Sequence, residues 1–314
     1  MNGNSDLDLN KIALECGLDK NLDSRIVLHN IAELEEFYEK EILLKIYNYL
    51  LENLTNPEYL IQVIRCYDNY RDNTVLPSVA KILQRSTSSE DDEGIDLRVI
   101  CAKSIANHKD TSYVTLLLDC MSNKKEHYKV RLACADALGK IGDKFAVSPL
   151  IDVVKDEEEK SIYLKESATK ALGIIGDDRA VEPLISILNT KHGIFSKFSF
   201  LKEKIIEALD KLNINNERIF SALKKSLYDE SPMVRINAIE AIMNSEDIRA
   251  EDCIRPCLSD PDNEVKKNAL IALYNLSDRT ILDEVIENND YSEYLKEVAK
   301  ELIEEYEDCE DEDE

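Results

Sequence analysis

The chain has 314 residues and a formal net charge of −25, with 33% charged residues, 6% aromatic residues and no tryptophan. Nucleic-acid binding depends mostly on phosphate neutralisation by Lys and Arg, so this charge disfavours a nucleic-acid partner, and it disfavours an anionic membrane surface for the same reason. A partner protein with a basic patch is favoured instead.

The N-terminus carries neither the basic segment nor the apolar run of a signal peptide, and the chain contains no run of 18 apolar residues. We therefore expect a cytoplasmic protein without a membrane anchor. Its eight cysteines are expected to be free thiols in that reducing compartment.

Helices are predicted in pairs along the whole chain. The first helices of the pairs are predicted over 7–16, 38–54, 74–85, 111–122, 144–156, 178–189, 215–228, 246–258 and 279–288. The second helices begin near Ile26, Leu60, Leu97, Val130, Leu164, Leu201, Val234, Val265 and Leu295, so the pairs recur every 30 to 37 residues. Apolar or small residues at i, i+4, i+7 and i+11 of the second helices predict one buried face.

The clearest repeat is Val130–Leu150, which recurs 34 residues later as Leu164–Leu184. Self-similarity at a period of about 20–50 residues is typical of a solenoid. All seven prolines fall on the predicted turns or in the first turns of helices, and half of the eight glycines fall where second helices end. The turn residues therefore support the same pattern of helix pairs.

The alternation of an AVxPLIxxL helix with a VRxxAxxALGxIGD helix resembles HEAT repeats, specifically the short HEAT-like repeats of phycobilisome lyase subunits. The match is best over 96–305 and only periodic over 7–85. The resemblance implies an all-α, right-handed α-α superhelix of roughly nine antiparallel helix pairs, forming one solenoid over 1–306. In that family a turn Asp and the Arg that opens the second helix form a ladder. Asp229 with Arg235 and Asp260 with Lys266 fit that ladder, which we expect to be interrupted between residues 97 and 202.

Three segments depart from the period. Residues 86–96, STSSEDDEGID, are predicted to form an acidic loop. Residues 191–200, KHGIFSKFSF, lengthen one repeat to 37 residues and contain three of the six phenylalanines. Residues 307–314 are predicted to be an acidic disordered tail, within a final segment in which nine of eleven residues are acidic.

Patterns that carry catalysis or bind metals are missing from the sequence. The four histidines form no HxH, HExxH or His-Glu pair, whereas deoxyhypusine hydroxylase, which the repeats also resemble, holds its iron with His-Glu dyads. Cys253 and Cys257 share a helix face, but no second pair or nearby His completes a tetrahedral site. No phosphate-binding loop or nucleophile elbow occurs. We therefore expect no enzymatic activity, no metal and no cofactor.

A cation opens each second helix from residue 97 onward. These cations are Arg98, Arg131, Lys165, Lys202, Arg235, Lys266 and Lys296. One interpretation is that they cap and pair within the turns of the stack. The other is that they form a positive stripe that meets an acidic partner or the chain's own tail.

Two sets of residues are predicted to bind a partner. The second helices are expected to line the inner face, from which polar side chains of alternating sign project: Lys103, Asp136, Lys170, Glu207 and Glu240. The aromatic residues of the 191–200 insertion are Phe195, Phe198 and Phe200. They are candidate anchors because exposed apolar clusters mark contacts, although Phe198 and Phe200 could instead seal the gap between neighbouring repeats.

These features favour a non-enzymatic scaffold or adaptor that binds another protein along the solenoid, as a candidate subunit of a larger complex. An accessory or maturation factor for a cofactor-containing enzyme complex is the alternative implied by the lyase-subunit resemblance. A nucleic-acid-acting enzyme similar to the alkylpurine glycosylases of this architecture is disfavoured, because the net charge is −25 and tryptophan is absent.

Overall fold

The computed structural model describes residues 9, 11–12, 23–85, 92–190, 199–212, 216–277 and 279–311. Within these ranges the regular elements are helices and no strand occurs. The chain divides into two compact units. Unit 1 comprises 1–154 with 163–171, and unit 2 comprises 155–162 with 172–314.

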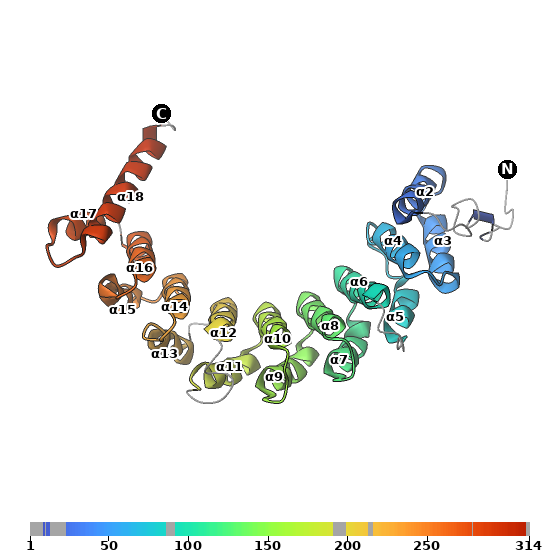
Figure 1. Ribbon diagram of the computed structural model, residues 1–314, viewed down its shortest axis with the longest axis horizontal. Coiled ribbons are helices and arrows are strands. Elements are labelled where there is room, and N and C mark those ends of the chain that lie inside the picture. The colour runs from blue at the N-terminus through green and yellow to red at the C-terminus, as the bar shows by residue number, and fades with distance from the viewer. Residues whose placement is uncertain are drawn as a thin grey trace. The chain divides into compact units, whose positions relative to one another are not determined.

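Each unit is a stack of helix pairs in which the first helices lie on one side and the second helices on the other (Figure 1). The second helices are α2 (Ser24–Phe37), α4 (Pro57–Tyr67), α6 (Asp92–His108), α8 (Tyr128–Ile141), α10 (Ile162–Ile175), α12 (Ser199–Leu212), α14 (Pro232–Asn244), α16 (Asn263–Leu276) and α18 (Glu293–Asp311). The first helices are α3 (Lys40–Asn53), α5 (Leu76–Gln84), α7 (Val114–Ser122), α9 (Val147–Lys155), α11 (Val181–Leu188), α13 (Glu217–Ser226), α15 (Ala250–Ile254) and α17 (Thr280–Glu287).

Short 3₁₀ segments extend several first helices. They are η1 (Thr111–Tyr113), η2 (Lys144–Ala146) and η3 (Asp178–Ala180) before α7, α9 and α11, and η5 (Arg255–Ser259) after α15. With these segments included, the predicted helix pairs are confirmed from α3 to α18. Of the first helix predicted over 7–16, only residues 9, 11 and 12 are described, and these are helical.

A turn aspartate starts the first helix of several pairs. Its carboxylate accepts the backbone N–H two residues later, at 2.8–3.1 Å. The residues that do this are Asp110, Asp143, Asp177 and Asp247. Such a cap satisfies an N–H that has no partner inside the helix. Gly142 and Gly176, which precede two of these aspartates, have φ of +79° and +70°, a region that glycine adopts without strain. The Gly-Asp dipeptide therefore ends one helix and begins the next.

Small residues allow the second helices to pack closely. In unit 1, a Cβ added to Gly139 of α8 would lie 2.8 Å from the Cα of Ala171 in α10. In unit 2, a Cβ added to Gly173 would lie 2.9 Å from the Cα of Ala208 in α12. Contact this close places backbone against backbone, so these two glycines and two alanines are packing residues of the stack.

The boundaries of two predicted segments need correction. The acidic loop predicted over 86–96 ends earlier, because α6 begins at Asp92, while residues 86–91 lie outside the described ranges. Asp92 and Glu93 occupy the first turn of α6, where carboxylates are favourable. At the other end, α18 continues to Asp311, so residues 307–311 of the predicted disordered tail are helical and 312–314 are not described. Glutamate, which dominates this end, is a good helix former.

The apolar face of α18 packs through Leu295, Val298 and Ala299, which are at most 5% exposed. Among the helices of the described ranges, none combines the length and the apolar character that are needed to cross a lipid bilayer.

An aromatic pair joins α4 and α6 in unit 1. The rings of Tyr67 and His108 stack with their centroids 4.6 Å apart, and the Tyr67 hydroxyl donates to the carbonyl of Asp72. The His108 side chain is only 3% exposed, and its Nε2 lies 3.6 Å from the Asp68 carboxylate and has no hydrogen-bond partner. Burial lowers the pKa of His108 below 6.5, although the carboxylates of Asp68, Asp72 and Asp110 oppose that shift.

The lowered pKa of His108 predicts that unit 1 loses stability on mild acidification. As the pH falls below about 6.5, the unfolded chain takes up a proton that the buried imidazole resists, so the free energy of unfolding decreases. We expect His108→Asn to reduce this dependence between about pH 7.5 and 5.5. Urea unfolding followed by circular dichroism at each pH measures it. The matched control is His29→Asn, whose wild-type side chain is 71% exposed. An equal change of slope in both variants would contradict the prediction.

Candidate protein-interaction surface

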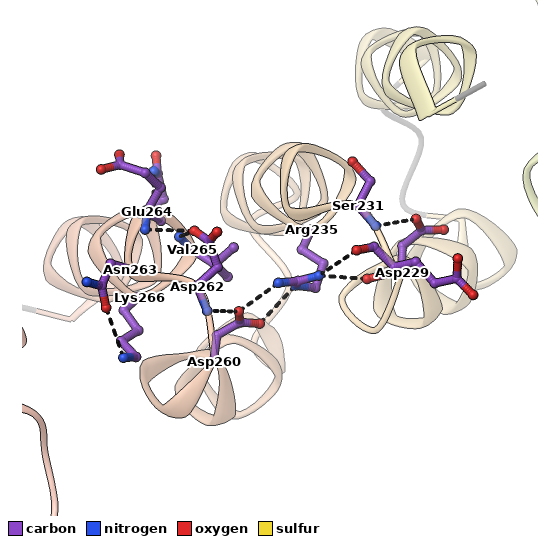
Figure 2. A network of polar contacts seen from close by, with 11 residues as sticks. Asp229, Ser231, Arg235, Asp260, Asp262, Asn263, Glu264, Val265 and Lys266 are labelled. Carbon is purple, nitrogen blue, oxygen red and sulfur yellow. Dashed lines mark hydrogen bonds and ion pairs between the residues drawn. The ribbon is translucent and has the colours of Figure 1, made fainter. Parts of the chain in front are cut away.

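In unit 2, Arg235 of α14 joins two successive turns of the stack (Figure 2). Its Nε and Nη2 donate to the two carboxylate oxygens of Asp260 at 2.9 and 2.7 Å, and its Nη1 donates to the carbonyl of Asp229 at 2.8 Å. The Arg235 and Asp260 side chains are each 9% exposed. A bidentate pair of this kind fixes orientation as well as distance.

The same arrangement recurs one pair earlier in unit 2. Lys202 of α12 donates to the Asp229 carboxylate at 2.6 Å, and the other oxygen of that carboxylate accepts the N–H of Ser231 at 3.0 Å. In both cases a cation of one second helix meets the acid in the turn of the following pair. We call these contacts the turn ladder: Lys202–Asp229 and Arg235–Asp260 in unit 2.

The ladder partners predicted from the sequence are wrong. Arg235 bonds to the backbone carbonyl of Asp229 rather than to its carboxylate, and Lys266 donates to Asn263 at 3.1 Å rather than to Asp260 (Figure 2). The physical reason is that each turn carboxylate is directed toward the preceding second helix, where it neutralises a buried cation. The acid and the cation that lie six residues apart in the sequence therefore belong to different rungs.

Unit 1 contains a rung in the region where the ladder was expected to be interrupted. Arg98 of α6 makes two charged contacts with Glu126, at 2.6 and 2.5 Å, and its Nε donates to the carbonyl of Leu83 at 3.0 Å. In this rung Glu126, 28 residues after Arg98, takes the place of the turn aspartate. The Glu126 side chain, which is longer than that of an aspartate, reaches the guanidinium of Arg98.

Buried cations also cap the first helices of unit 1. Arg131 Nε donates to the carbonyl of Met121 at 2.8 Å, and Lys165 Nζ donates to that of Val154 at 3.0 Å. Such contacts satisfy carbonyls at a helix end. The side chains of Arg98, Arg131, Lys165 and Arg235 are at most 9% exposed. The structural interpretation of the cations is therefore confirmed for these four, and a positive stripe open to a partner is wrong for them.

The turn ladder holds α12 and α14 side by side, and a groove lies between their exposed edges. Its lining includes the carboxylates of Glu207, Asp210 and Glu240 and the amide of Asn237. Ile206, Lys211 and Ala241 complete the lining. The groove therefore combines negative charge with a small apolar floor.

Two carboxylates on α12 have a raised pKa. Burial raises the pKa of Glu203, and Glu207 adds to the shift while Lys204 opposes it. Burial also raises the pKa of Asp210, and the Asn244 amide, which donates to it at 3.2 Å, opposes the shift. Asp210 lines the groove, and partial loss of hydration makes its carboxylate attractive to a cation that enters there.

Two exposed apolar side chains lie near the N-terminal ends of α12 and α14, and we call them the apolar edge. Phe200 of α12 is 49% exposed and Met233 of α14 is 52% exposed. Lys204 connects the two kinds of surface, because its Nζ lies 5.5 Å from the centroid of the Phe200 ring and 2.6 Å from Glu207 Oε1. Phe195 and Phe198 lie outside the described residues.

The structure places the five polar residues predicted for the inner face on second helices. Glu207 and Glu240 lie together at the α12–α14 groove of unit 2. In unit 1, Lys103 of α6 and Lys170 of α10 are exposed, and Asp136 of α8 is half-buried. Their part in binding remains a prediction.

Sequence reasoning missed Asp210, Asn237 and Lys211 at the groove. The inner-face prediction named a single residue in each second helix, whereas residues three and four apart in a helix lie on the same face. Asp210 lies three residues after Glu207, and Asn237 three before Glu240, so this spacing was the available signal.

The described residues contain no group of three or more His, Cys, Asp or Glu side chains arranged to hold a metal ion. Cys253 and Cys257 are buried free thiols in α15 and η5. The surface of unit 2 described above consists of a groove, its carboxylates and an apolar edge, and these are features of noncovalent binding.

A family model described as HEAT repeats matches residues 87–163, 201–273 and 220–304, which together cover more than half of the chain. The chain belongs to the HEAT-repeat family. The PBS lyase HEAT-like repeat matches residues 164–190, so the resemblance seen in the sequence is confirmed. A comparison with curated protein sequences gives no match.

Several solved HEAT-like structures are similar to this chain at low sequence identity. The CpcE–CpcF complex of phycocyanin lyase from Nostoc sp. PCC7120 is 19% identical, with 73% of this chain and 87% of the matched chain covered and a TM-score of 0.44. YibA of Escherichia coli is 16% identical, with 90% and 97% covered and a TM-score of 0.50. The karyopherin Kap121p, bound to the extreme C-terminus of the protein phosphatase Cdc14p, is 13% identical, with 92% and 37% covered and a TM-score of 0.54. The chain thus spans little more than a third of Kap121p, and the likenesses to YibA and Kap121p support the all-α HEAT solenoid fold.

Proposed function

We propose that this HEAT-repeat protein is a non-enzymatic scaffold that binds a basic, partly apolar segment of another protein on the second-helix face of unit 2. The observation that carries the proposal is the α12–α14 groove, in which Glu207, Asp210 and Glu240 line one depression. An Arg or Lys side chain of a partner would neutralise these carboxylates as it enters.

The apolar edge supports a partner that is basic and apolar at once. Phe200 and Met233 are about half exposed, on the same two helices that form the acidic groove. Aromatic side chains on a protein surface are frequent anchors of interfaces, with charged residues around them that set specificity. A structure of Kap121p has the SUMO protease Ulp1p bound. It supports the proposal because it is an example of a HEAT-like stack that binds another protein.

The alternative function, an accessory or maturation factor for a cofactor-containing enzyme complex, rests on the resemblance of the repeats alone. No contact among the described side chains favours it over the scaffold. The proposal therefore concerns the binding of a protein segment and leaves cofactor chemistry out.

Removing two groove charges is expected to weaken binding of a basic peptide. We would measure, by fluorescence anisotropy, the dissociation constant of a synthetic peptide that alternates Arg and Leu. The Glu207→Gln/Glu240→Gln variant should bind it about tenfold more weakly, or ~1.4 kcal/mol, because two attractive charges are lost. The wild-type affinity should also fall as salt is added.

The matched control is Asp283→Asn/Glu287→Gln, which removes the same charge from exposed positions of α17. It should bind the peptide like the wild type. An equal loss in the control would mean that the peptide responds to net charge alone, which contradicts a site at the groove. Phe200→Ala should weaken the Arg-Leu peptide and leave a peptide that alternates Arg and Ser unchanged.

A further inference from the structure

Unit 2 contains a second hollow, which shares part of its lining with the α12–α14 groove. It has a volume of about 190 Å³ and is lined by the C-terminal turns of α12 and α14 and the first turns of α13. We call it the α13 cavity. Asp210 and Ala241 line both the cavity and the groove, so the two hollows adjoin at these residues. A segment bound in the groove therefore has the cavity within reach of a long side chain.

The least exposed part of the cavity lining is apolar. The residues that form it are at most 6% exposed and come from α12, α13 and α14: Leu209, Ile219, Phe220, Leu223 and Ala241. Methylene groups that lie on such a surface leave water, which is favourable. The lining therefore favours an aliphatic chain.

The charged part of the lining is acidic overall. It consists of the carboxylates of Asp210, Glu217 and Asp247 and the guanidinium of Arg249, a formal charge of −2. Arg249 Nη2 donates to Glu217 at 2.8 Å and to Asp247 at 2.7 Å. Asp210 accepts the Asn244 amide at 3.2 Å and forms no ion pair with any residue that the structure describes. The cavity thus has one carboxylate for which no cation is supplied.

The size of the cavity favours lysine over arginine. Its 190 Å³ equals about six times the volume of a liquid water molecule, roughly 30 Å³. A lysine side chain, with its four-carbon stem and compact ammonium, fits this space, whereas arginine is larger and ends in a rigid planar fork. The guanidinium of Arg249 also lies 4.2 Å from the centroid of the Phe220 ring, so that ring face is already covered by one cation.

We propose that the α13 cavity is the anchor site for a lysine side chain of the partner segment, with Asp210 binding its ammonium group. The inference rests on the proposed binding of a basic segment in the α12–α14 groove, and it adds a preference for lysine at one position of that segment. The stem of the lysine lies on the apolar lining, and its ammonium donates to the carboxylate that has no cation of its own. Such a side chain leaves little of its methylene surface in water.

The experiment compares two peptides on the full-length protein by fluorescence anisotropy. One alternates Lys and Leu, the other alternates Arg and Leu, and they have equal length and charge. The wild type should bind the Lys-Leu peptide at least about threefold more tightly, as expected for one partly exposed ion pair. Asp210→Asn should remove this preference, because the lysine ammonium loses its carboxylate.

Two further variants separate the cavity from the general charge of unit 2. Ser245→Leu narrows the cavity and leaves every charge in place, because Ser245 lines the cavity and not the groove. It should also remove the preference. The matched control is Glu203→Gln, which makes the same change of charge on α12 at a residue that lines neither hollow. It should keep the preference of the wild type.

The ratio of the two dissociation constants decides the anchor. Equal affinity for the two peptides, tighter binding of the Arg-Leu peptide, a preference that survives either Asp210→Asn or Ser245→Leu, or its loss in Glu203→Gln would overturn the inference. The groove is judged separately, because Glu207→Gln/Glu240→Gln should weaken both peptides and keep the preference. If that variant binds both peptides like the wild type, the groove proposal fails, and the ratio still decides whether lysine is anchored in the cavity.

Discussion

Replacing Arg235 with alanine is expected to lower the free energy of unfolding of unit 2 by about 3–5 kcal/mol. The substitution leaves the Asp260 carboxylate, 9% exposed, without its bidentate partner. It also removes the donor to the carbonyl of Asp229. An unpaired buried charge is costly because it has lost its hydration without compensation. Urea unfolding followed by circular dichroism, combined with hydrogen exchange of the α14 and α16 amides, measures the effect.

The control is Arg218→Ala in the same unit. Arg218 also pairs with a carboxylate of a neighbouring repeat, Glu182, at 2.5 Å, but their side chains are 71% and 60% exposed. An exposed ion pair contributes about 0–1 kcal/mol, so this variant should remain close to the wild type. Equal destabilisation by the two substitutions would show that burial of the turn ladder has no special importance.

Replacing Gly139 with alanine is expected to destabilise unit 1 even though alanine is the better helix former. The added Cβ would meet the Cα of Ala171 at 2.8 Å and its Cβ at 2.9 Å, so α8 and α10 must move apart. Overpacking costs about 1–3 kcal/mol. The gain in helix propensity is about 1 kcal/mol. We therefore expect a net loss of up to about 2 kcal/mol in urea unfolding.

The sign of the change in the free energy of unfolding shows which effect dominates, overpacking or helix propensity. Stabilisation by about 1 kcal/mol, the value that helix propensity alone predicts, would contradict the close approach of the two helices. Lys140→Ala serves as the control, because Lys140 is the exposed neighbour of Gly139 in α8 and tests propensity without the contact.

The fold was largely predictable because its signals are local. The VRxxAxxALGxIGD phrase encodes the buried face of a second helix, its glycine C-cap and the aspartate cap of the next helix within a short stretch of sequence. Two boundaries were misplaced, at Asp92 and Asp311, where acidic composition suggested disorder but glutamate and aspartate are compatible with helix ends or helix interiors.

The contacts between repeats were much harder to predict. Arg235 pairs with Asp260, 25 residues away, rather than with the closer Asp229, because the partner depends on how one pair stacks on the next. The position of Asp210 in the groove likewise depends on the rotation of α12 and α14 about their axes. One sequence without a structure does not define these rotations to the accuracy of a single side chain.

The two edges of unit 2 differ in how strongly salt screens their charged contacts. At the turns between first and second helices, neighbouring pairs are linked by buried charges at Arg235–Asp260, which salt screens weakly. At the opposite ends of the first helices the links are exposed, as at Arg249–Glu217, where the side chains are 46% and 72% exposed. We therefore expect rising ionic strength to weaken the charged contacts at the exposed edge of unit 2, while those at the buried edge persist.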